Sequence, residues 1–334
     1  MKPFVSIIIP NYNKADYIAQ TLDSLQAQSC KEWEAVIVDD GSTDDSIKII
    51  KQYAQKDPRF RLIERNREPK GGSVCRNIGL ENALGEYVIY LDSDDLLAND
   101  ALKHRLEMFS SYADNDFLVF PTGTFKKVPG DNKSVWRAHK EKHLQHFLLH
   151  RLSWHTTSPI WKRAFLFQLN GFDEAFPRLQ DVELHTRALM VEGVAYKVFR
   201  EVEPDSYYRI DEKRLVSSYP KFMERWVQGV CMYVEKMSKE ITSKKHLNTQ
   251  IHLNYLKGTV ISMVTQLLYH QKQGNIDAKQ RDALMGILLY NKSIQKILSS
   301  FDLTFIQIYR KLYILGLYKM KGFNYLFCKI ILKV

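Results

Sequence analysis

The first 120 residues alternate short apolar runs with amphipathic stretches. The apolar runs carry β-branched and aromatic side chains, which suit a packed, pleated surface, so they predict buried strands. These runs cover residues 5–9, 35–38, 61–63, 87–91 and 117–121. Apolar side chains at helical spacing predict helices over 14–28, 42–54, 71–85 and 101–109. Strand and helix in alternation predict an α/β fold with a mostly parallel sheet covered on both faces.

The second half of the chain is less regular and then becomes helical. Helices are predicted over 140–150, 162–169 and 182–191, and strands over 195–199 and 206–209. Beyond residue 218 the apolar spacing is helical to the C-terminus. We therefore expect two domains, an α/β domain over 1–217 and a helical, basic region over 218–334.

The positive charge of the chain is confined to its last third. The formal net charge is +10, and residues 235–334 hold 16 Lys and Arg against 5 Asp and Glu, whereas residues 1–234 hold 32 against 33. An excess this localised predicts an anionic partner for the C-terminal region. We expect no nucleic-acid partner, because the basic residues lie in a helical tail without a recognition motif.

Residues 301–334 combine this charge with apolar side chains. They hold six Lys and Arg against one acidic residue, and Phe305, Ile308, Tyr309, Leu312 and Leu315 fall at helical spacing. A basic, aromatic helix of this kind fits docking on an anionic membrane surface. The alternative is a helix packed on the α/β domain with its lysines in water. The localised charge favours the membrane.

Nothing in the sequence predicts export or membrane insertion. The N-terminus leads directly into a strand pattern rather than a signal peptide, and no run of 18 apolar residues occurs. The four cysteines are too far apart to suggest a metal knuckle or a CxxC redox pair, which suits a reducing compartment. We expect a cytoplasmic protein, peripheral on the inner face of the cell membrane where the tail docks.

Three carboxylates follow the predicted strand at 87–91, in the run Asp92-Ser93-Asp94-Asp95. Carboxylates this close repel one another unless they hold a cation or face open water. Mg²⁺ or Mn²⁺ takes carboxylate oxygens and leaves positions for phosphate oxygens. This spacing alone is compatible with both a metal site and a solvated acidic turn.

Similar polar groups follow the other predicted strands. They are Pro10-Asn11-Tyr12-Asn13, Asp39-Asp40-Gly41-Ser42, and Gly71-Gly72-Ser73 with Arg76 and Asn77. Taken singly, these are typical of turns, helix caps and a surface arginine. Parallel strands, however, end along one edge of a sheet, where the ligands of open α/β sheets bind. Together the groups predict a site for a phosphorylated ligand that carries a base.

The ordered set of motifs resembles the inverting family-2 glycosyltransferases, which have the GT-A fold. The resemblance spans residues 4–215 and is carried by VSIIIPNYN at 5–13, VDDGSTD at 38–44, GSVCRNIG at 72–79, YLDSDD at 90–95, NGFDE at 170–174 and QDVEL at 180–184. It implies transfer of a sugar from a nucleoside-diphosphate donor, with UDP favoured, to a hydroxyl of a glycan or a lipid-linked acceptor. It also implies a place in cell-surface polysaccharide synthesis.

The resemblance implies roles for individual residues. The donor-binding set is Pro10, Tyr12, Asp39, Asp40, Arg76, Asp92, Ser93 and Arg209. In this set Tyr12 stacks on the base, Asp40 accepts a hydrogen bond from it, and Arg76 lies near the base or the diphosphate. Asp94 matches the aspartate that holds Mn²⁺ or Mg²⁺.

Asp181 matches the general base of the family, which deprotonates the acceptor hydroxyl. Without the family, an aspartate at this position is more typical of a helix cap. The family usually has Glu-Asp here, whereas this chain has Gln180 before the aspartate. Processive members carry Gln-x-x-Arg-Trp, and this chain has Phe222 in place of the Gln. That difference indicates an enzyme that adds a single sugar rather than a processive polymerase.

Two alternatives to a glycosyltransferase stay open. The first is a nucleotidyltransferase or dinucleotide-binding enzyme of related α/β architecture, although no G-x-G-x-x-G follows the first strand, where a dinucleotide-binding fold needs it. The second is an inactive carbohydrate- or nucleotide-binding descendant of the family, which Gln180 suggests. His155 could face the acceptor or ligate the metal, although a lone histidine is more often structural.

Overall fold

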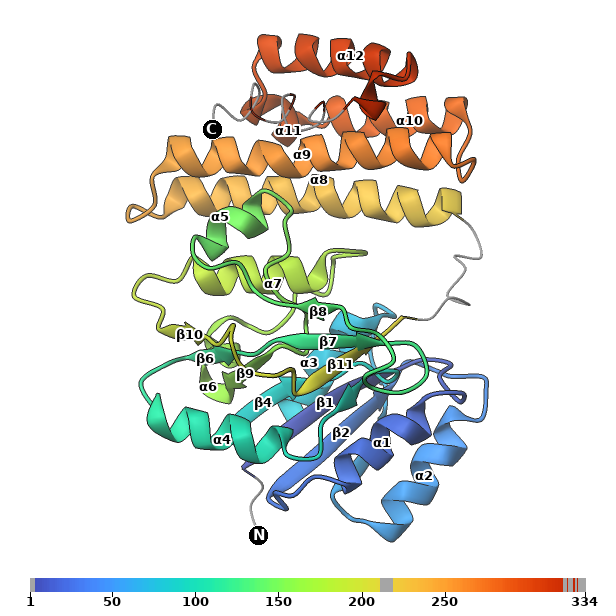
Figure 1. Cartoon of the computed structure of the whole chain (residues 1–334), viewed down its shortest axis with the longest axis vertical. Coiled ribbons are helices and arrows are strands. Elements are labelled where there is room, and N and C mark those ends of the chain that lie inside the picture. The colour runs from blue at the N-terminus through green and yellow to red at the C-terminus, as the bar shows by residue number, and fades with distance from the viewer. Residues whose placement is uncertain (1–3, 211–218, 321–322, 324–326, 328, 330–334) are drawn as a thin grey trace. The chain divides into compact units, whose positions relative to one another are not determined.

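The computed structural model describes residues 4–210 and 219–320, together with residues 323, 327 and 329. These residues form two units. Figure 1 shows the chain coloured from blue at the N-terminus to red at the C-terminus. The α/β unit comprises residues 4–141, 152–175 and 187–210, and the helical unit comprises 142–151, 176–186 and the residues from 219 onwards. The predicted boundary between residues 217 and 218 lies outside the described residues.

A seven-stranded sheet forms the centre of the α/β unit (Figure 1), in the order β10-β6-β9-β4-β1-β2-β3. Its strands are β1 (Val5–Asn11), β2 (Trp33–Asp39), β3 (Phe60–Glu64), β4 (Tyr87–Tyr90), β6 (Phe117–Val119), β9 (Pro159–Lys162) and β10 (Tyr196–Val198). The neighbours β3, β2, β1 and β4 are parallel, as predicted, whereas β9 runs antiparallel between β4 and β6. The four carboxyl ends therefore lie along one edge.

Four helices pack on this sheet: α1 (Ile18–Gln26), α2 (Ser46–Lys56), α3 (Gly72–Asn82) and α4 (Ala101–Ser111). Successive side chains of a strand point to opposite faces, and β2 supplies both cores. Ala35 and Ile37 pack in the core that contains residues of α1, α2 and α4, while Val36 and Val38 pack against α3. The central strands β1, β2 and β4 are buried on both faces, which explains their continuous apolar runs.

Helices α1 and α2 begin four residues later than predicted. Asn13 and Ser42 are of residue types that favour helix caps, but here they bond the loop after β1 to the loop after β2. The backbone N–H of Asn13 donates to Ser42 Oγ at 2.9 Å, and that of Thr43 donates to Asn13 Oδ1 at 2.8 Å. The loop after β1 is fixed further along, where the backbone N–H of Lys14 donates to Ser46 Oγ at 2.8 Å.

A second sheet has the order β5-β11-β7-β8, which the hydrophobic pattern did not predict as a sheet. Its strands are β5 (Leu96–Leu97), β7 (Thr122–Phe125), β8 (Val135–Trp136) and β11 (Ser206–Arg209). Next to β11, Asp205 forms a two-pronged, buried ion pair with Arg105 of α4, at 2.6 and 2.8 Å. Although burial raises the pKa of Asp205, the charge and hydrogen bonds of Arg105 outweigh it and lower that pKa.

The remaining segments form short or helical elements. Helix α6 (Arg163–Gln168) belongs to the α/β unit. The helical unit contains α5 (His143–Leu148), the start of α7 (Gln180–Leu189), α8 (Tyr219–Ser243), α9 (Thr249–Lys272), α10 (Ala278–Leu289), α11 (Lys292–Ile297), α12 (Ser300–Ile314) and the short η1 (Leu317–Lys319). Helices α8 and α9 lie side by side (Figure 1). The predicted helical pattern is confirmed over residues 219–320, the continuous part of this region that the structure describes. Among the described residues, no helix is long and apolar enough to cross a bilayer.

The two faces of α12 differ. The packed face consists of Asp302, Ile306, Tyr309 and Tyr313. It is fixed by a buried ion pair between Asp302 and Lys257 of α9 at 2.8 Å. The open face carries three apolar side chains at intervals of seven residues, Phe301, Ile308 and Leu315, which are 58%, 44% and 76% exposed. Residues 321–322, 324–326, 328 and 330–334 of the tail lie outside the described residues.

One internal clamp fixes the segment between α6 and α7 to α3. The Asn77 amide nitrogen donates to Phe172 O at 2.9 Å, and its oxygen accepts from the Phe172 N–H at 2.8 Å. Gly171 precedes this residue in the left-handed region at φ +60°, and a Cβ there would collide with Asn77 Oδ1. Phe172 is thereby held beneath Arg76, whose guanidinium lies 5.2 Å from the ring centroid.

Substitution of Gly171 by Ala tests this clamp against a matched glycine. Gly193 also has a left-handed backbone, at φ +73°, but a Cβ there meets no atom within 4 Å. Gly193→Ala should lower the free energy of unfolding by about 1–2 kcal/mol, because alanine is strained in the left-handed backbone. Gly171→Ala should lower it by about 1–3 kcal/mol more, because the new methyl group also displaces the Asn77 amide. Urea unfolding of both variants measures the difference. Equal losses of stability would mean that the Asn77 amide moves aside without an energetic cost.

Candidate functional site

Asp39 organises the loop at the carboxyl end of β2. Its carboxylate accepts hydrogen bonds from Asn11 Nδ2 at 2.7 Å, Ser42 Oγ at 2.6 Å, and the backbone N–H groups of Gly41 and Ser42 at 2.9 and 2.8 Å. The residue is buried, so these bonds compensate the desolvation of its charge. Both oxygens of this predicted donor-binding residue are engaged within the protein.

Asp40 lies between the loops that follow β2 and β3. It accepts hydrogen bonds from Arg65 Nε at 2.6 Å and from the backbone N–H of Gly71 at 3.2 Å. Burial, assisted by the negative charge of Asp40, raises the pKa of the neighbouring Cys75 thiol to about 12. Cys75 is therefore a neutral thiol in the core and not a nucleophile.

Two predicted base-binding residues lie at the end of β1. Pro10 pairs with Val38 in the parallel register of β1 and β2. Tyr12 follows the strand and is 44% exposed, with Lys70 Nζ lying 3.7 Å from its ring centroid. An exposed aromatic ring with a lysine over one face offers a stacking surface, because the long lysine side chain can move aside.

Arg76 and Asp92 join the ends of α3 and β4. Arg76 Nη2 donates to Asp92 Oδ1 at 2.6 Å. The arginine is largely buried and backed by Phe172, which meets Tyr90 edge-on at 5.0 Å. The clamp around Asn77 therefore also sets the position of the guanidinium, which is the group expected beside a diphosphate.

The rest of the acidic run is held by cations from two other elements. Lys14 Nζ forms an ion pair with Asp94 Oδ2. Arg209 of β11 binds this run through its backbone N–H to Asp95 Oδ1 at 2.9 Å and through its Nε to Asp94 O at 2.8 Å. Its Nη2 donates to Gln20 Oε1 at 2.8 Å. Ser93 and Asp94 are buried, so the run is not the solvated acidic turn that its spacing also allowed.

Three side chains of this region could hold a metal ion together. Asp92, Asp95 and His155 each offer a ligand atom, and these atoms lie within 4.8 Å of one another. Carboxylate oxygens and an imidazole nitrogen are ligands that Mn²⁺ accepts, so the donor set fits the cation that the motifs predict. His155, left open as acceptor-facing or metal-binding, is thus brought to the acidic run.

Asp181 lies in the helical unit, as the second residue of α7. The preceding Gln180 donates from Nε2 to Phe176 O at 3.1 Å, a bond that a glutamate in its ionised form could not make. Nearby, burial lowers the pKa of His150, against the opposing charge of Asp181. Helix α7 begins at Gln180, two residues before its predicted start at residue 182.

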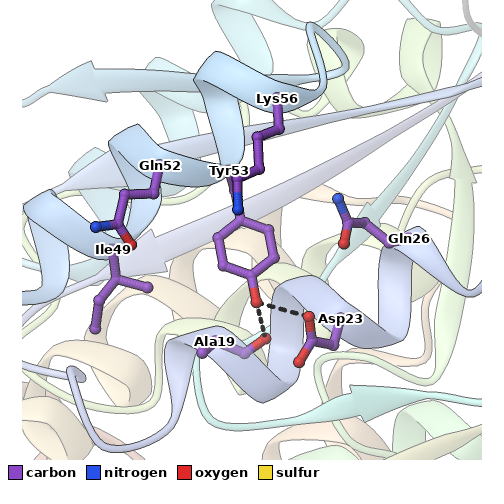
Figure 2. Close-up of a pocket in the computed structure, with 7 residues that line it drawn as sticks. All are labelled: Ala19, Asp23, Gln26, Ile49, Gln52, Tyr53 and Lys56. Atoms are coloured by element: carbon purple, nitrogen blue, oxygen red, sulfur yellow. Dashed lines mark hydrogen bonds between the residues drawn. The ribbon is translucent and has the colours of Figure 1, made fainter.

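Figure 2 shows a pocket between α1 and α2 that has a different character. It is lined by Ala19, Asp23, Gln26, Ile49, Gln52, Tyr53 and Lys56. The Tyr53 hydroxyl donates to Asp23 at 2.6 Å and to Ala19 O at 3.3 Å, which ties the two helices together. None of these lining residues follows a strand of the central sheet at its carboxyl end. The candidate site is therefore the sheet edge and not this pocket.

Several residues of the predicted donor-binding set lie at the sheet edge. Asp40 follows β2, Arg76 lies in α3 after β3, and Asp92 follows β4, where it pairs with Arg76. Arg209 of β11 bonds to the backbone oxygen of Asp94, the predicted metal ligand. The sequence interpretation missed Lys14, Arg65 and Phe172, which neutralise or support these residues. Lys14 and Arg65 stand only a few residues beyond β1 and β3, so their position after a strand was an available signal.

Comparison with known proteins identifies this arrangement. The family model described as glycosyl transferase family 2 matches residues 6–172, half of the chain. The putative teichuronic acid biosynthesis glycosyltransferase TuaG of Bacillus subtilis is 46% identical over 106 residues, which are 32% of this chain and only 42% of the relative. The putative glycosyltransferase EpsH of the same organism is 26% identical over 268 residues, 75% of each protein.

Solved structures resemble the chain over most of its length. TarS 1–349 of S. aureus in complex with UDP-GlcNAc has a TM-score of 0.67 at 18% identity, covering 100% of this chain and 91% of its own. The mannosyltransferase PcManGT from Pyrobaculum calidifontis, in complex with GDP-Man and Mn²⁺, has a TM-score of 0.51 at 21% identity and covers 87% and 88%. At these identities the likeness shows the GT-A fold alone. The family match and the fold agree with the predicted resemblance, and the chain belongs to glycosyltransferase family 2.

Proposed function

We propose that this chain is an inverting glycosyltransferase. It transfers a hexosyl or N-acetylhexosaminyl group from a nucleoside-diphosphate donor, first of all a UDP-sugar, to a hydroxyl of a glycan or lipid-linked acceptor in cell-surface polysaccharide synthesis. The observation that carries the proposal is the sheet edge, where Asp40, Asp92 and Asp94 follow parallel strands and each forms an ion pair, with Arg65, Arg76 and Lys14 respectively. The names of TuaG and of the UDP-GlcNAc complex of TarS support a carbohydrate donor and a cell-envelope product.

Each donor group has a candidate partner at this edge. The exposed Tyr12 ring stacks on the base, and Asp40 accepts a hydrogen bond from it. The Arg76 guanidinium faces the diphosphate. Asp94 holds Mn²⁺ or Mg²⁺, with Asp92, Asp95 and His155 as the neighbouring ligand group. When bound, the cation neutralises the charge that develops on the leaving diphosphate.

Asp181 is the proposed general base. Its carboxylate takes the proton of the acceptor hydroxyl while the hydroxyl oxygen bonds to the anomeric carbon. The bond from that carbon to the diphosphate oxygen breaks in the same displacement, so the configuration inverts and the nucleoside diphosphate leaves with both electrons. Gln180 is compatible with this role, because its amide stabilises the start of α7 without competing for the proton.

Asp181→Asn tests the base directly. The amide keeps the size of the side chain but cannot accept a proton, so transfer should fall by about 10²–10⁴-fold, the usual contribution of a general base. Thermal denaturation should show that UDP with Mn²⁺ still stabilises the variant, because donor binding belongs to the sheet edge. Sugar transfer is measured as UDP release from a panel of UDP-sugars with glycan and lipid-linked acceptors.

Asp114→Asn is the matched control, since Asp114 is an exposed carboxylate of the α/β unit. It should retain full transfer. If Asp181→Asn transfers as fast as the wild type, the base assignment is wrong. If the wild type binds nucleotide but neither transfers nor hydrolyses any donor, the chain is the inactive descendant that Gln180 suggested.

We further propose that the chain works at the cytoplasmic surface of the cell membrane, docked through the tail 301–334. The open face of α12 presents Phe301, Ile308 and Leu315 beside the exposed Lys311, and Lys319 follows in η1. Arg310 is already paired with Asp282 at 2.6 Å. Apolar insertion combined with lysines on anionic headgroups gives such a surface its affinity.

Vesicle flotation tests the docking. Deleting the tail would also remove the packed face of α12, so the triple substitution of Phe301, Ile308 and Leu315 by Ser is the better variant. Binding to phosphatidylglycerol vesicles should fall at least about tenfold, because less apolar area enters the bilayer. The wild type should also detach as salt is raised. The matched control replaces three exposed apolar residues of the α/β unit, Leu84, Val128 and Phe167. Equal flotation of both triple variants would exclude α12 as the docking surface.

A further inference from the structure

Lys14 lies in the loop before α1, and its side chain reaches the acidic run. Its Nζ pairs with Asp94 Oδ2 and lies 5.6 Å from the Tyr17 ring centroid. Its backbone is fixed, because its N–H donates to Ser46 Oγ at 2.8 Å. The lysine side chain is 22% exposed whereas that of Asp94 is 5% exposed, so the ammonium approaches a buried carboxylate from the solvent side.

The cations around the acidic run are attached to different degrees. Arg209 is buried and bonded to Asp94 O, Asp95 and Gln20, and it packs between the rings of Tyr17 and Phe125. Arg76 is backed by Phe172 in the Asn77 clamp. Lys14 has a flexible side chain on a fixed backbone, and its ammonium forms an ion pair with Asp94. Of these three cations, Lys14 is therefore the easiest to displace without moving a strand or a helix.

We propose that Lys14 is an exchangeable counter-ion. It neutralises Asp94 while the site holds no donor, and it gives up this carboxylate when a divalent cation and a nucleoside diphosphate bind. The released ammonium then pairs with the oxygens of the diphosphate. The inference rests on the proposed role of Asp94 in metal binding and adds a residue that couples metal binding to donor binding.

Electrostatics determines whether metal binding and nucleotide binding strengthen or weaken each other. A divalent cation that binds Asp94 alone must break the ion pair and then lies close to a displaced positive charge, which is unfavourable. A diphosphate supplies the negative charge that the displaced ammonium needs, so metal and nucleotide each bind better in the presence of the other. Lys14 thus disfavours a bare metal ion and favours the metal–nucleotide pair.

Lys14→Met separates these effects, because it removes the charge and keeps most of the length of the side chain. Mn²⁺ alone should bind the variant about tenfold tighter than the wild type, the order expected when an ion pair no longer has to be broken. UDP in the presence of saturating Mn²⁺ should bind about tenfold more weakly, because the diphosphate loses an ion pair. Isothermal titration calorimetry measures both affinities, and neither needs sugar transfer.

Two control variants complete the test. Lys14→Arg keeps the charge and should leave the Mn²⁺ affinity close to that of the wild type. Lys103→Met removes the same charge from the exposed face of α4 and should change neither affinity. An unchanged or weaker Mn²⁺ affinity in Lys14→Met would overturn the proposal, and so would a parallel loss of both affinities. Opposite shifts in a protein that transfers no sugar would uphold the role of Lys14 and reject the proposed function.

Discussion

The repulsion between carboxylates at one edge of a parallel sheet is the constraint on which the site depends. Asp39 ends β2, Asp40 follows it, and Asp92, Asp94 and Asp95 follow β4, so the topology gathers five acidic side chains. Each has its own partner: Asp39 bonds to amides and hydroxyls of the nearby loops, Asp40 to Arg65, Asp92 to Arg76, Asp94 to Lys14, and Asp95 to the backbone N–H of Arg209. The negative charges at the sheet edge are therefore already paired within the protein. A ligand that binds there can replace one of these partners.

The positions of these acidic residues could be predicted from the sequence because they follow strands. Alternating strand and helix patterns imply a parallel sheet, and a parallel sheet brings the residues after each strand to one edge. The partners could not be predicted in the same way. Lys14 and Phe172 are separated from the residues they contact by about 80 and 96 positions, and a local pattern carries no information on contacts at that distance.

The strands that escaped prediction are those without a distinct period. Strand β9 is short, apolar and antiparallel within an otherwise parallel neighbourhood, β7 has the sequence Thr-Gly-Thr-Phe, and β5 and β8 contain two residues each. Such segments become strands because a partner strand is already in place. Their own side chains do not show the spacing that distinguishes a strand from other structures. The late starts of α1 and α2 have a related cause. Asn13 and Ser42 are good helix caps, but the bonds between their two loops compete for the same atoms.

The proposed base, Asp181, lies in α7, and contacts within the helical unit hold the start of this helix in place. Glu183 of α7 is fully buried and pairs with Lys236 of α8 at 2.7 Å, while Thr186 and Tyr233 share a hydrogen bond of 2.8 Å. These contacts, together with the amide of Gln180, set the start of α7 independently of the pairs that organise the sheet edge. In the proposed mechanism, donor and acceptor chemistry thus depend on separately packed units. Substitutions in α8 can alter the presentation of the base without disturbing the charge pairs that receive the nucleotide.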